Sequence, residues 1–391
     1  MEPDMQLNHL LDLVEPSRSV TLLARTKELM QTDPTIINMT GGEPDFDTPK
    51  KVCDAAYQAM LAGETHYASP KGDPALREAI AEKLRRENGA SYSADQILVT
   101  PGGKYGIYAA IQAILNPGDE VLWLTPGYVS YPAIVTLCGG SPVAVHLDYD
   151  RDYRITGEAL EAAVTEKTRL LILNYPNNPT SRILHADELE EIKAFLRRHS
   201  QVLVLSDEIY EKILFDDNRM LSLISDPEFA DRVVLINGFS KCMAMTGWRL
   251  GYVACPEPLY GAISRIFQHS LSATASFSQK AAIVALDCRE EMEEMRASYE
   301  RRMQIMMDGF ADIPNMELKR PEGAFYAWVK FDTDWSAEEL CDRLLESYGV
   351  AGIPGSAYGE EKYTTVRFCF AAPEERLHEM IRRMHEFSKL I

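Results

Sequence analysis

Short, uninterrupted apolar runs recur through the middle of the chain, and they constrain its fold more than any other feature. Seven such runs lie at Ile97–Thr100, Val121–Leu124, Val143–His146, Leu170–Leu173, Val202–Leu205, Val233–Ile236 and Tyr252–Cys255. A strand covered by helices on both faces is apolar throughout, whereas a half-exposed strand alternates. Segments with helical spacing, such as 104–115 and 186–198, lie between the runs. The pattern predicts an α/β fold with a mostly parallel, seven-stranded sheet flanked by helices.

Past Cys288 the pattern changes. A long charged helical stretch covers 290–309. Further strands and helices are expected at 325–330, 366–370, 337–348 and 373–387, and an earlier helix at 20–30. We therefore expect a large domain over 45–288 and a smaller α+β domain over 289–391. Residues 1–44 form an N-terminal segment that is expected to join the small domain.

The charge balance excludes several classes of partner. Forty basic against 59 acidic residues give a net charge of −19, which repels phosphate backbones and anionic lipid, so we expect no nucleic acid and no membrane partner. The start of the chain, residues 1–4, lacks the features of a secretory signal, and no apolar run is long enough to cross a bilayer. The seven cysteines form no CxxC pair and the histidines no metal-binding pattern. Free thiols, a cytoplasmic location and no metal site are therefore expected.

Polar and aromatic residues come directly after several predicted strands, where open α/β sheets bind ligands. Two glycines, Gly102 and Gly103, precede a helix whose backbone N–H groups can hold a phosphate. Later strands are followed by an aromatic ring, an asparagine-rich loop, a carboxylate, a lysine and an arginine, at Tyr128, 174–180, Asp207, Lys241 and Arg249. Each feature alone has an ordinary explanation, such as a tight turn, a core ring or a surface lysine. Together they place phosphate-binding, aromatic, acidic and basic groups at one sheet edge.

This combination fits a phosphorylated aromatic cofactor that is bound covalently to a lysine. An electropositive, desolvated site helps the amine of Lys241 to become neutral and reactive. A carboxylate about 3 Å from a ring nitrogen attracts its proton by roughly 5 kcal/mol at an effective dielectric of about 20, before desolvation is subtracted. Asp207 can therefore keep a pyridine nitrogen protonated. The sequence predicts pyridoxal 5′-phosphate (PLP) as the cofactor.

Ordered motifs extend this interpretation over nearly the whole chain. They are Gly42-Glu43-Pro44-Asp45-Phe46, Tyr67 with Pro70 and Gly72, Gly102-Gly103-Lys104, Asn177-Asn178-Pro179-Thr180, Asp207 with Tyr210, Ser240-Lys241, Thr246-Gly247-Trp248-Arg249-Leu250-Gly251, Pro321-Glu322-Gly323-Ala324-Phe325-Tyr326 and Arg367-Phe368-Cys369-Phe370-Ala371. With these motifs the chain resembles the class I/II aminotransferases of PLP fold type I. Within them it is similar to the bacterial aspartate-aminotransferase-like subgroup.

The resemblance implies three catalytic residues. Lys241 would form the internal aldimine with PLP and then act as base and acid in the proton shift. Asp207 would pair with the pyridine nitrogen, and Tyr210 would hydrogen-bond the cofactor's phenolic oxygen. The implied reaction moves an amino group between an L-amino acid and a 2-oxo acid by a ping-pong mechanism.

The resemblance also implies the binding residues. Further cofactor contacts would come from Gly103, Lys104, Tyr128, Asn178, Ser240 and Arg249, with Tyr128 on the ring and Gly103, Lys104 and Arg249 at the phosphate. Tyr67 would reach the phosphate of the neighbouring subunit, which implies a homodimer with shared sites. Arg367 would clamp the substrate α-carboxylate with a fork that lysine cannot copy. Asn178 and Gly42 would complete the substrate site, Gly42 because a side chain there would intrude.

Three positions depart from the family pattern. Gly238 stands where a phosphate-binding serine is common, and Ser240 could compensate for it. Ser181 stands where glycine is common, and a positive φ there would cost serine about 1 kcal/mol. Gly106 stands where alanine is frequent, and it could loosen the helix or make room for a larger group. These departures leave a second hypothesis open, PLP-dependent elimination, cyclisation or oxidation on the same fold.

A third hypothesis, a regulator built on an aminotransferase-like domain, would need a DNA-binding module. The net charge of −19 and the roughly 40 residues before the first motif count against it. Among substrates, Lys104 either reads a distal carboxylate, which favours aspartate or glutamate, or contributes only its backbone. Arg18 either enters the substrate mouth or is an ordinary surface residue. Aromatic substrates also stay open.

Overall fold

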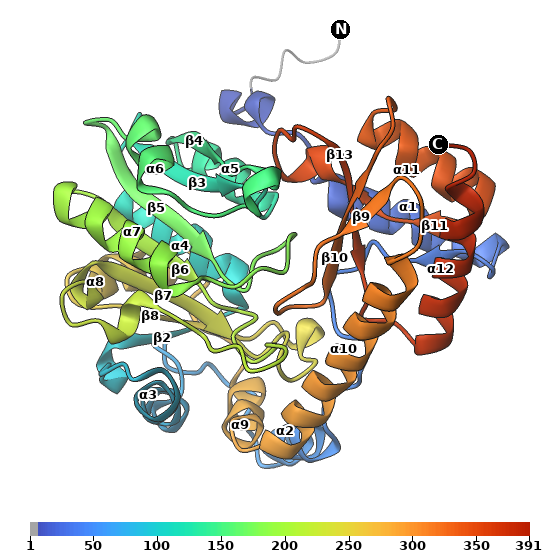
Figure 1. Cartoon of the computed structure of the whole chain (residues 1–391). Helices are drawn as coiled ribbons and strands as arrows, with labels where there is room; N and C mark the ends of the chain where they lie inside the picture. The colour runs from blue at the N-terminus through green and yellow to red at the C-terminus, as the bar shows by residue number, and fades with distance from the viewer. Residues whose placement is uncertain (1–6) are drawn as a thin grey trace, which may run out of the picture.

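The computed structural model describes residues 7–391 and contains a seven-stranded sheet as its largest element (Figure 1). The sheet order is β2 (Ile97–Thr100), β8 (Gly251–Ala254), β7 (Val233–Gly238), β6 (Leu203–Asp207), β5 (Thr168–Asn174), β3 (Glu120–Thr125) and β4 (Ser141–His146). Only β8 runs antiparallel to its neighbours. All seven apolar runs are strands of this sheet, so the predicted fold class is confirmed. Residues 1–4, on which the expectation about a secretory signal depends, lie outside the described residues.

Helices cover both faces of this sheet. One face carries α4 (Gly103–Ile114), α5 (Ser130–Leu137) and α8 (Leu259–Ser270); the other carries α2 (Lys50–Leu61), α3 (Pro74–Asn88), α6 (Gly157–Ala163), α7 (Ala186–Arg198) and α9 (Ser276–Ala285). Alternate residues of one strand enter different cores: Leu98 packs with α4 and α8, whereas Ile97 and Val99 pack with α3 and α9. Because both faces are buried, Ile97, Leu98 and Val99 are all apolar.

A second, antiparallel sheet lies beside the first (Figure 1). Its order is β12 (Ile353–Pro354), β13 (Thr364–Cys369), β10 (Tyr326–Phe331) and β9 (Met316–Leu318). The helices α10 (Arg289–Phe310), α11 (Ala337–Tyr348) and α12 (Glu374–Phe387) share a buried core with it. Short 3-10 helices lie at His9–Leu13, Ala94–Gln96, Tyr149–Arg151, Leu223–Ser225, Ala230–Arg232, Thr246–Trp248 and Gly355–Tyr358.

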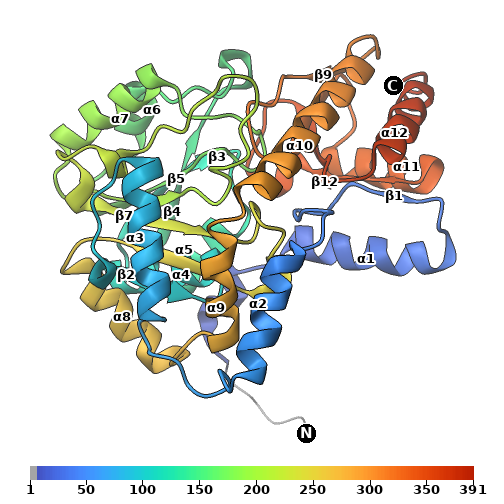
Figure 2. The ribbon, with the colours of Figure 1, turned by 90° about the horizontal axis from the view of Figure 1, so that it is seen from below.

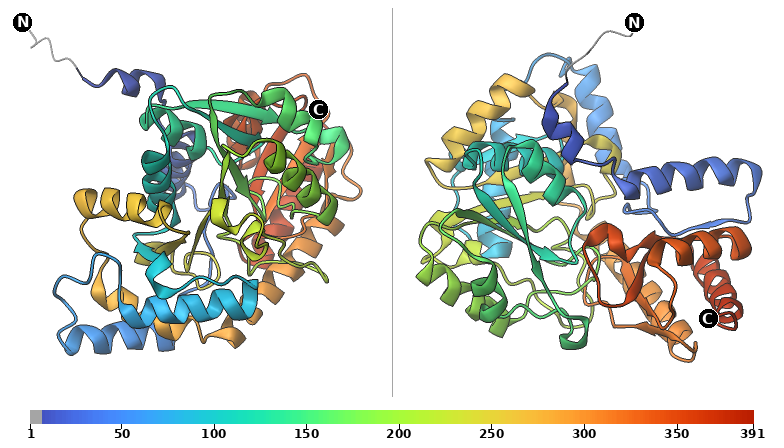
Figure 3. Two further views of the ribbon diagram at one scale, coloured as in Figure 1. Left: turned by 90° about the vertical axis from the view of Figure 1, so that its left-hand side faces the viewer. Right: turned by 90° about the horizontal axis from the view of Figure 1, so that it is seen from above.

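Residues 18–38 of the N-terminal segment lie beside the second sheet and its helices, whereas the 3-10 helix at His9–Leu13 contacts α5. Its strand β1 (Ile37–Asn38) pairs in parallel with β11 (Val350–Ala351). Its helix α1 (Arg18–Thr32) lies beside α11, to which Arg18 is linked by an ion pair with Glu338 (Figure 2; Figure 3). This pairing agrees with an N-terminal segment that joins the smaller unit, while the domain boundaries themselves stay a prediction.

Close packing explains two of the three departures from the family pattern. A Cβ at Gly106 would lie 2.9 Å from Val253 Cγ2, because α4 is pressed against β8. The space that Gly106 leaves is therefore filled by the Val253 side chain and is not open to a ligand. A Cβ at Gly238 would lie 2.8 Å from Gly251 Cα on the neighbouring strand. A serine at 238 would need β7 and β8 to move apart.

Candidate active site

A cavity of ≈ 430 Å³ opens at the carboxyl ends of the parallel strands, between the two sheets and the N-terminal segment. Its walls include Lys241, Asp207, Tyr210, Gly103, Lys104, Tyr128, Asn178, Ser240, Arg249, Gly42 and Arg367. These are eleven of the twelve site residues expected from the sequence. Strand ends of the first sheet, strands of the second sheet and the N-terminal segment all contribute, so the cavity forms only when the three parts fold together.

The acidic group of the cavity is Asp207, the last residue of β6. Its carboxylate is buried and accepts a hydrogen bond from the Tyr131 hydroxyl (2.8 Å) and one from the Ile209 backbone N–H (3.3 Å). Burial raises the pKa of Asp207 to about 6. Within residues 7–391, no lysine or arginine forms an ion pair with this carboxylate. Asp207 therefore suits a cationic ligand group brought in from outside the chain.

The basic group is Lys241, which follows β7. Its Nζ donates a hydrogen bond to the Gly42 carbonyl and lies 5.9 Å from the centre of the Tyr210 ring. Burial lowers the pKa of Lys241 to about 8, because the ammonium form loses its hydration. A lysine with this pKa carries a substantial neutral, nucleophilic fraction near neutral pH.

A buried guanidinium, Arg367 on β13, closes the opposite side of the cavity. It donates to Asn178 Oδ1 (3.0 Å) and to the backbone carbonyls of Thr40 (2.8 Å) and Gly41 (3.0 Å). Its carbon Cζ lies 4.4 Å from the centre of the Tyr326 ring. Its Nε is buried and forms no hydrogen bond with the described residues. This donor is left for a ligand that carries an acceptor such as a carboxylate.

A second group of donors surrounds the start of α4. Gly102 precedes the helix with φ of 85°, and no side chain caps the first turn. The first-turn residues Gly103 and Lys104 line the cavity, as does Arg249. A Cβ at Gly102 would lie 2.6 Å from Arg249 Nη2, and the positive φ of this residue favours glycine as well. Free helix N–H groups next to a guanidinium form a site for a phosphate.

Two cavity residues were missed as functional candidates, Tyr131 and Tyr326. Tyr131 lies on α5, three residues after Tyr128, and its ring meets Tyr128 edge to face at 5.4 Å. Tyr128 lies before α5, so helical spacing gives no signal for this contact, and only the closeness of the two tyrosines in the sequence pointed to it. The hydroxyl of Tyr326 lies 2.6 Å from that of Tyr210, although these residues are 116 positions apart. No local sequence pattern reveals that contact.

Tyr67 is the one expected site residue that the structure keeps out of the cavity. Its side chain is 96% exposed. A single chain does not test a contact with a neighbouring subunit, so the role of Tyr67 stays a prediction.

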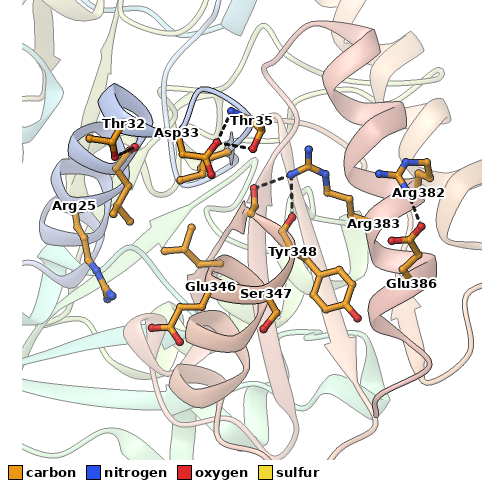
Figure 4. Close-up of a pocket in the computed structure, with 14 residues that line it drawn as sticks. Arg25, Thr32, Asp33, Thr35, Glu346, Ser347, Tyr348, Arg382, Arg383 and Glu386 are labelled. Carbon is orange, nitrogen blue, oxygen red and sulfur yellow. Dashed lines mark hydrogen bonds and ion pairs between the residues drawn. The ribbon is translucent and has the colours of Figure 1, made fainter.

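A larger cavity, ≈ 620 Å³, lies between the ends of α1 and α11 and the side of α12 (Figure 4). Its arginines are held by protein groups: Arg383 donates to the Tyr348 carbonyl (2.9 Å), and Arg382 donates to Glu386 (2.6 Å). Because these guanidinium groups already have protein partners, this cavity offers less for catalysis than the smaller one.

Comparison with known proteins decides the family. A family model described as "Aminotransferase class I and II" matches residues 34–384. This chain belongs to the class I and II aminotransferases. The enzyme is a PLP-dependent transferase, so the predicted cofactor and reaction are confirmed and transamination takes precedence over elimination, cyclisation or oxidation.

Individual relatives cover almost the whole chain. A probable aspartate/prephenate aminotransferase from Aquifex aeolicus is 38% identical, over 95% of this chain and 95% of that protein. A bifunctional aspartate aminotransferase and glutamate/aspartate-prephenate aminotransferase from Petunia hybrida is 37% identical, over 98% of this chain and 83% of that protein. Among solved structures, aspartate aminotransferase from Thermus thermophilus with maleate superposes with a TM-score of 0.92 at 34% identity, covering 99% and 100% of the two chains.

The cavity fits PLP on its own evidence. It combines a phosphate site at α4 and Arg249, a buried carboxylate without a cation at Asp207, and a lysine with a lowered pKa at Lys241. In the described part of the chain, no cluster of His, Cys, Asp and Glu could hold a metal ion, and no helix is both long and apolar enough to cross a membrane.

Proposed function

We propose that Lys241 binds the cofactor aldehyde and afterwards carries the transferred proton. When bound, PLP supplies an electron-accepting ring that stabilises negative charge on the substrate Cα. Lys241 lines the cavity, and its amine donates a hydrogen bond to the Gly42 carbonyl. Its pKa of about 8 lets the amine accept a proton and return it near neutral pH. The position of Lys241 in the cavity wall, together with its lowered pKa, is the observation that carries this proposal.

The remaining polar groups hold the reactants in our proposal. Asp207 keeps the ring nitrogen protonated, with Tyr131 and the Ile209 N–H supporting its ionised form. Tyr210 and Asn178 donate to the phenolic oxygen of the cofactor. The first turn of α4 and Arg249 hold the phosphate, and buried Ser240 adds support from the loop before Lys241.

Arg367 binds the substrate α-carboxylate, and Asn178 keeps the guanidinium oriented through their 3.0 Å hydrogen bond. The close approach of Tyr326 limits what can replace Gly42, because a Cβ there would lie 3.1 Å from the Tyr326 hydroxyl. The α-carboxylate therefore meets a rigid, buried clamp, which orients the Cα–H bond for proton removal.

The first test monitors the amine transfer itself. Enzyme loaded with PLP should lose its visible absorbance on addition of a donor amino acid and regain it with a 2-oxo acid. Lys241→Ala should reduce turnover by at least about 10³-fold, because the base is lost, and borohydride should no longer fix PLP on the peptide that carries residue 241. Lys193→Ala, a control on α7 that does not line the cavity, should turn over like the unmodified enzyme. Undiminished turnover by Lys241→Ala would contradict the proposal.

For the substrate, we propose a dicarboxylic amino acid such as aspartate or glutamate as one partner. The side chain of Lys104 is exposed, lines the cavity and places Nζ 5.5 Å from the Tyr128 ring centre. Several relatives are named aspartate aminotransferases. Arg18 instead pairs with Glu338 at 2.7 Å and does not line the cavity, which favours the interpretation that Arg18 is an ordinary surface residue. An aromatic substrate is the second candidate, because aromatic aminotransferase from Pyrococcus horikoshii superposes with a TM-score of 0.88 at 37% identity over 94% and 99% of the chains.

Substitution of Lys104 separates these substrates. Lys104→Ala should lower kcat/KM for aspartate by about 10- to 100-fold, the value of one charge-assisted hydrogen bond. It should leave kcat/KM for phenylalanine within about twofold, because that substrate has no distal carboxylate. Steady-state kinetics with both donors tests this. An unchanged ratio of the two kcat/KM values would show that only the backbone of Lys104 is used.

We further propose a homodimer in which Tyr67 reaches the partner's phosphate site. Support comes from the exposure of the large apolar side chains Tyr57, Met60, Leu61 and Tyr67, which are gathered on α2 and the loop after it. Aromatic and aliphatic groups of this size are usually covered by a partner. A cytoplasmic site of action is supported by the seven free cysteines, and cell fractionation would test it.

Mixed dimers test the shared site. Tyr67→Ala should weaken PLP binding about 10-fold or more, because a hydrogen bond to an anion is lost. Reassembly of Tyr67→Ala chains with Lys241→Ala chains should give hybrids with one intact site. Their activity at limiting PLP should exceed the mean of the two parents and approach about a quarter of the unmodified enzyme under statistical mixing. Activity that stays at the parental mean would contradict a shared site.

A further inference from the structure

Ser181 is an unusual residue at the edge of the active site. It follows the 177–180 loop, is fully buried, and adopts the left-handed conformation with φ of 59°. A residue that carries a Cβ rarely adopts this conformation, which costs serine about 1 kcal/mol. A glycine would occupy the same backbone conformation without strain, which points to a use for the serine side chain.

The hydroxyl of Ser181 has a specific backbone partner. Its Oγ accepts a hydrogen bond from the N–H of Tyr326 at 3.1 Å, and its carbonyl accepts from Glu322 (2.9 Å) and Gly323 (3.0 Å). In the β10–β13 ladder Tyr326 lies opposite Cys369, and the neighbouring bond joins Phe370 N–H to the Phe325 carbonyl. The Tyr326 N–H therefore points away from β13.

The strand on the other side of β10 cannot supply an acceptor. β9 pairs with β10 only from Val329 to Phe331, so the ladder does not reach Tyr326. Without the Ser181 hydroxyl, the N–H of Tyr326 would be buried without a partner, and the start of β10 would lose an attachment to the asparagine loop.

Tyr326 itself touches both halves of the reaction site. Its hydroxyl lies 2.6 Å from the Tyr210 hydroxyl, and its ring lies 4.4 Å from the Arg367 guanidinium carbon. A displacement of Tyr326 would therefore also move Tyr210, which is proposed to bind the cofactor, and Arg367, which is proposed to bind the substrate.

We propose that Ser181 is a positioning residue. Its hydroxyl holds the backbone of Tyr326 in place, and Tyr326 in turn keeps the Tyr210 hydroxyl and the Arg367 guanidinium in position. This inference rests on the roles proposed above for Tyr210 and Arg367. Ser181 touches neither reactant and acts through Tyr326 alone. It also ties the asparagine loop of the first sheet to β10 of the second, because its three hydrogen bonds from 322, 323 and 326 all cross between these segments.

The test uses Ser181→Ala in the PLP-loaded enzyme and two readouts other than turnover. The first is the pH midpoint of the cofactor's absorbance change. It should rise by a few tenths of a pH unit, since a weakened Tyr210 donor raises the proton affinity of the conjugated Lys241 nitrogen. The second is the Kd of maleate, a dicarboxylate without an amine, which should rise about fivefold as Arg367 loses its alignment. In turnover, KM for the donor should rise more than kcat falls.

Ser181→Gly removes the hydroxyl together with the backbone strain. It should shift both readouts in the same direction as Ser181→Ala but unfold at a higher temperature than Ser181→Ala. If Ser181→Ala does not fold, Ser181→Gly is used in its place. Ser264→Ala on α8, a buried serine outside the site, is the matched control and should leave both readouts unchanged.

Two further variants separate this inference from the proposed function. Tyr210→Phe should shift the absorbance midpoint, and Arg367→Lys should weaken maleate binding. If they do so while both Ser181 variants match the unmodified enzyme, the proposed role of Ser181 is wrong and the proposed function stands. If Ser181→Ala changes only the unfolding temperature, its role is structural and the proposal is equally overturned. If Tyr210→Phe and Arg367→Lys have no effect, the proposed function fails first.

Discussion

The site depends on one buried carboxylate, that of Asp207, at the end of a strand whose other residues are mostly apolar. An ionised carboxylate in such surroundings is unstable unless it is hydrogen-bonded and paired with a cation. The chain supplies two hydrogen bonds, from Tyr131 and the Ile209 N–H, and no ion pair from the described residues. This arrangement leaves the charge of Asp207 to be balanced by a bound group, which is what a protonated pyridine ring provides. The unpaired carboxylate therefore destabilises the protein without cofactor and strengthens the binding of the cofactor.

The fold brings three separate parts of the chain to that carboxylate. The first sheet presents its strand ends, the second sheet presents Tyr326 and Arg367, and the N-terminal segment presents its backbone carbonyls. Arg367 connects all three, because its guanidinium on β13 donates to Asn178 after β5 and to the carbonyls of Thr40 and Gly41. The arginine that is proposed to bind the substrate therefore also connects the three parts of the chain.

Much of this was predictable from the sequence, for identifiable reasons. Continuous apolar runs located the strands because both faces of the sheet are buried, and the ligand groups stand in the loops directly after those runs. The antiparallel direction of β8 was not predictable, since an apolar run carries no direction. The Tyr210–Tyr326 contact and the hydrogen bond from Tyr326 to Ser181 join residues more than 100 positions apart, which no local pattern encodes. The departure of Ser181 from the glycine that is common there was visible in the sequence, whereas the bond that makes use of its hydroxyl was not.

The charge state of Asp207 is the most direct test of this account. Its carboxyl signal in a ¹³C-aspartate-labelled protein, assigned by comparison with Asp207→Asn, should titrate near pH 6 without PLP. Because this pKa lies above the unfolded value, the contribution of Asp207 to the stability of the empty protein, taken as the difference from Asp207→Asn, should fall as the pH rises from about 4 to about 6. With PLP bound, the signal should stay that of an ionised carboxylate down to below about pH 4, as expected next to a cation. A pKa that is the same with and without PLP would contradict the claim that this carboxylate is kept for the cofactor.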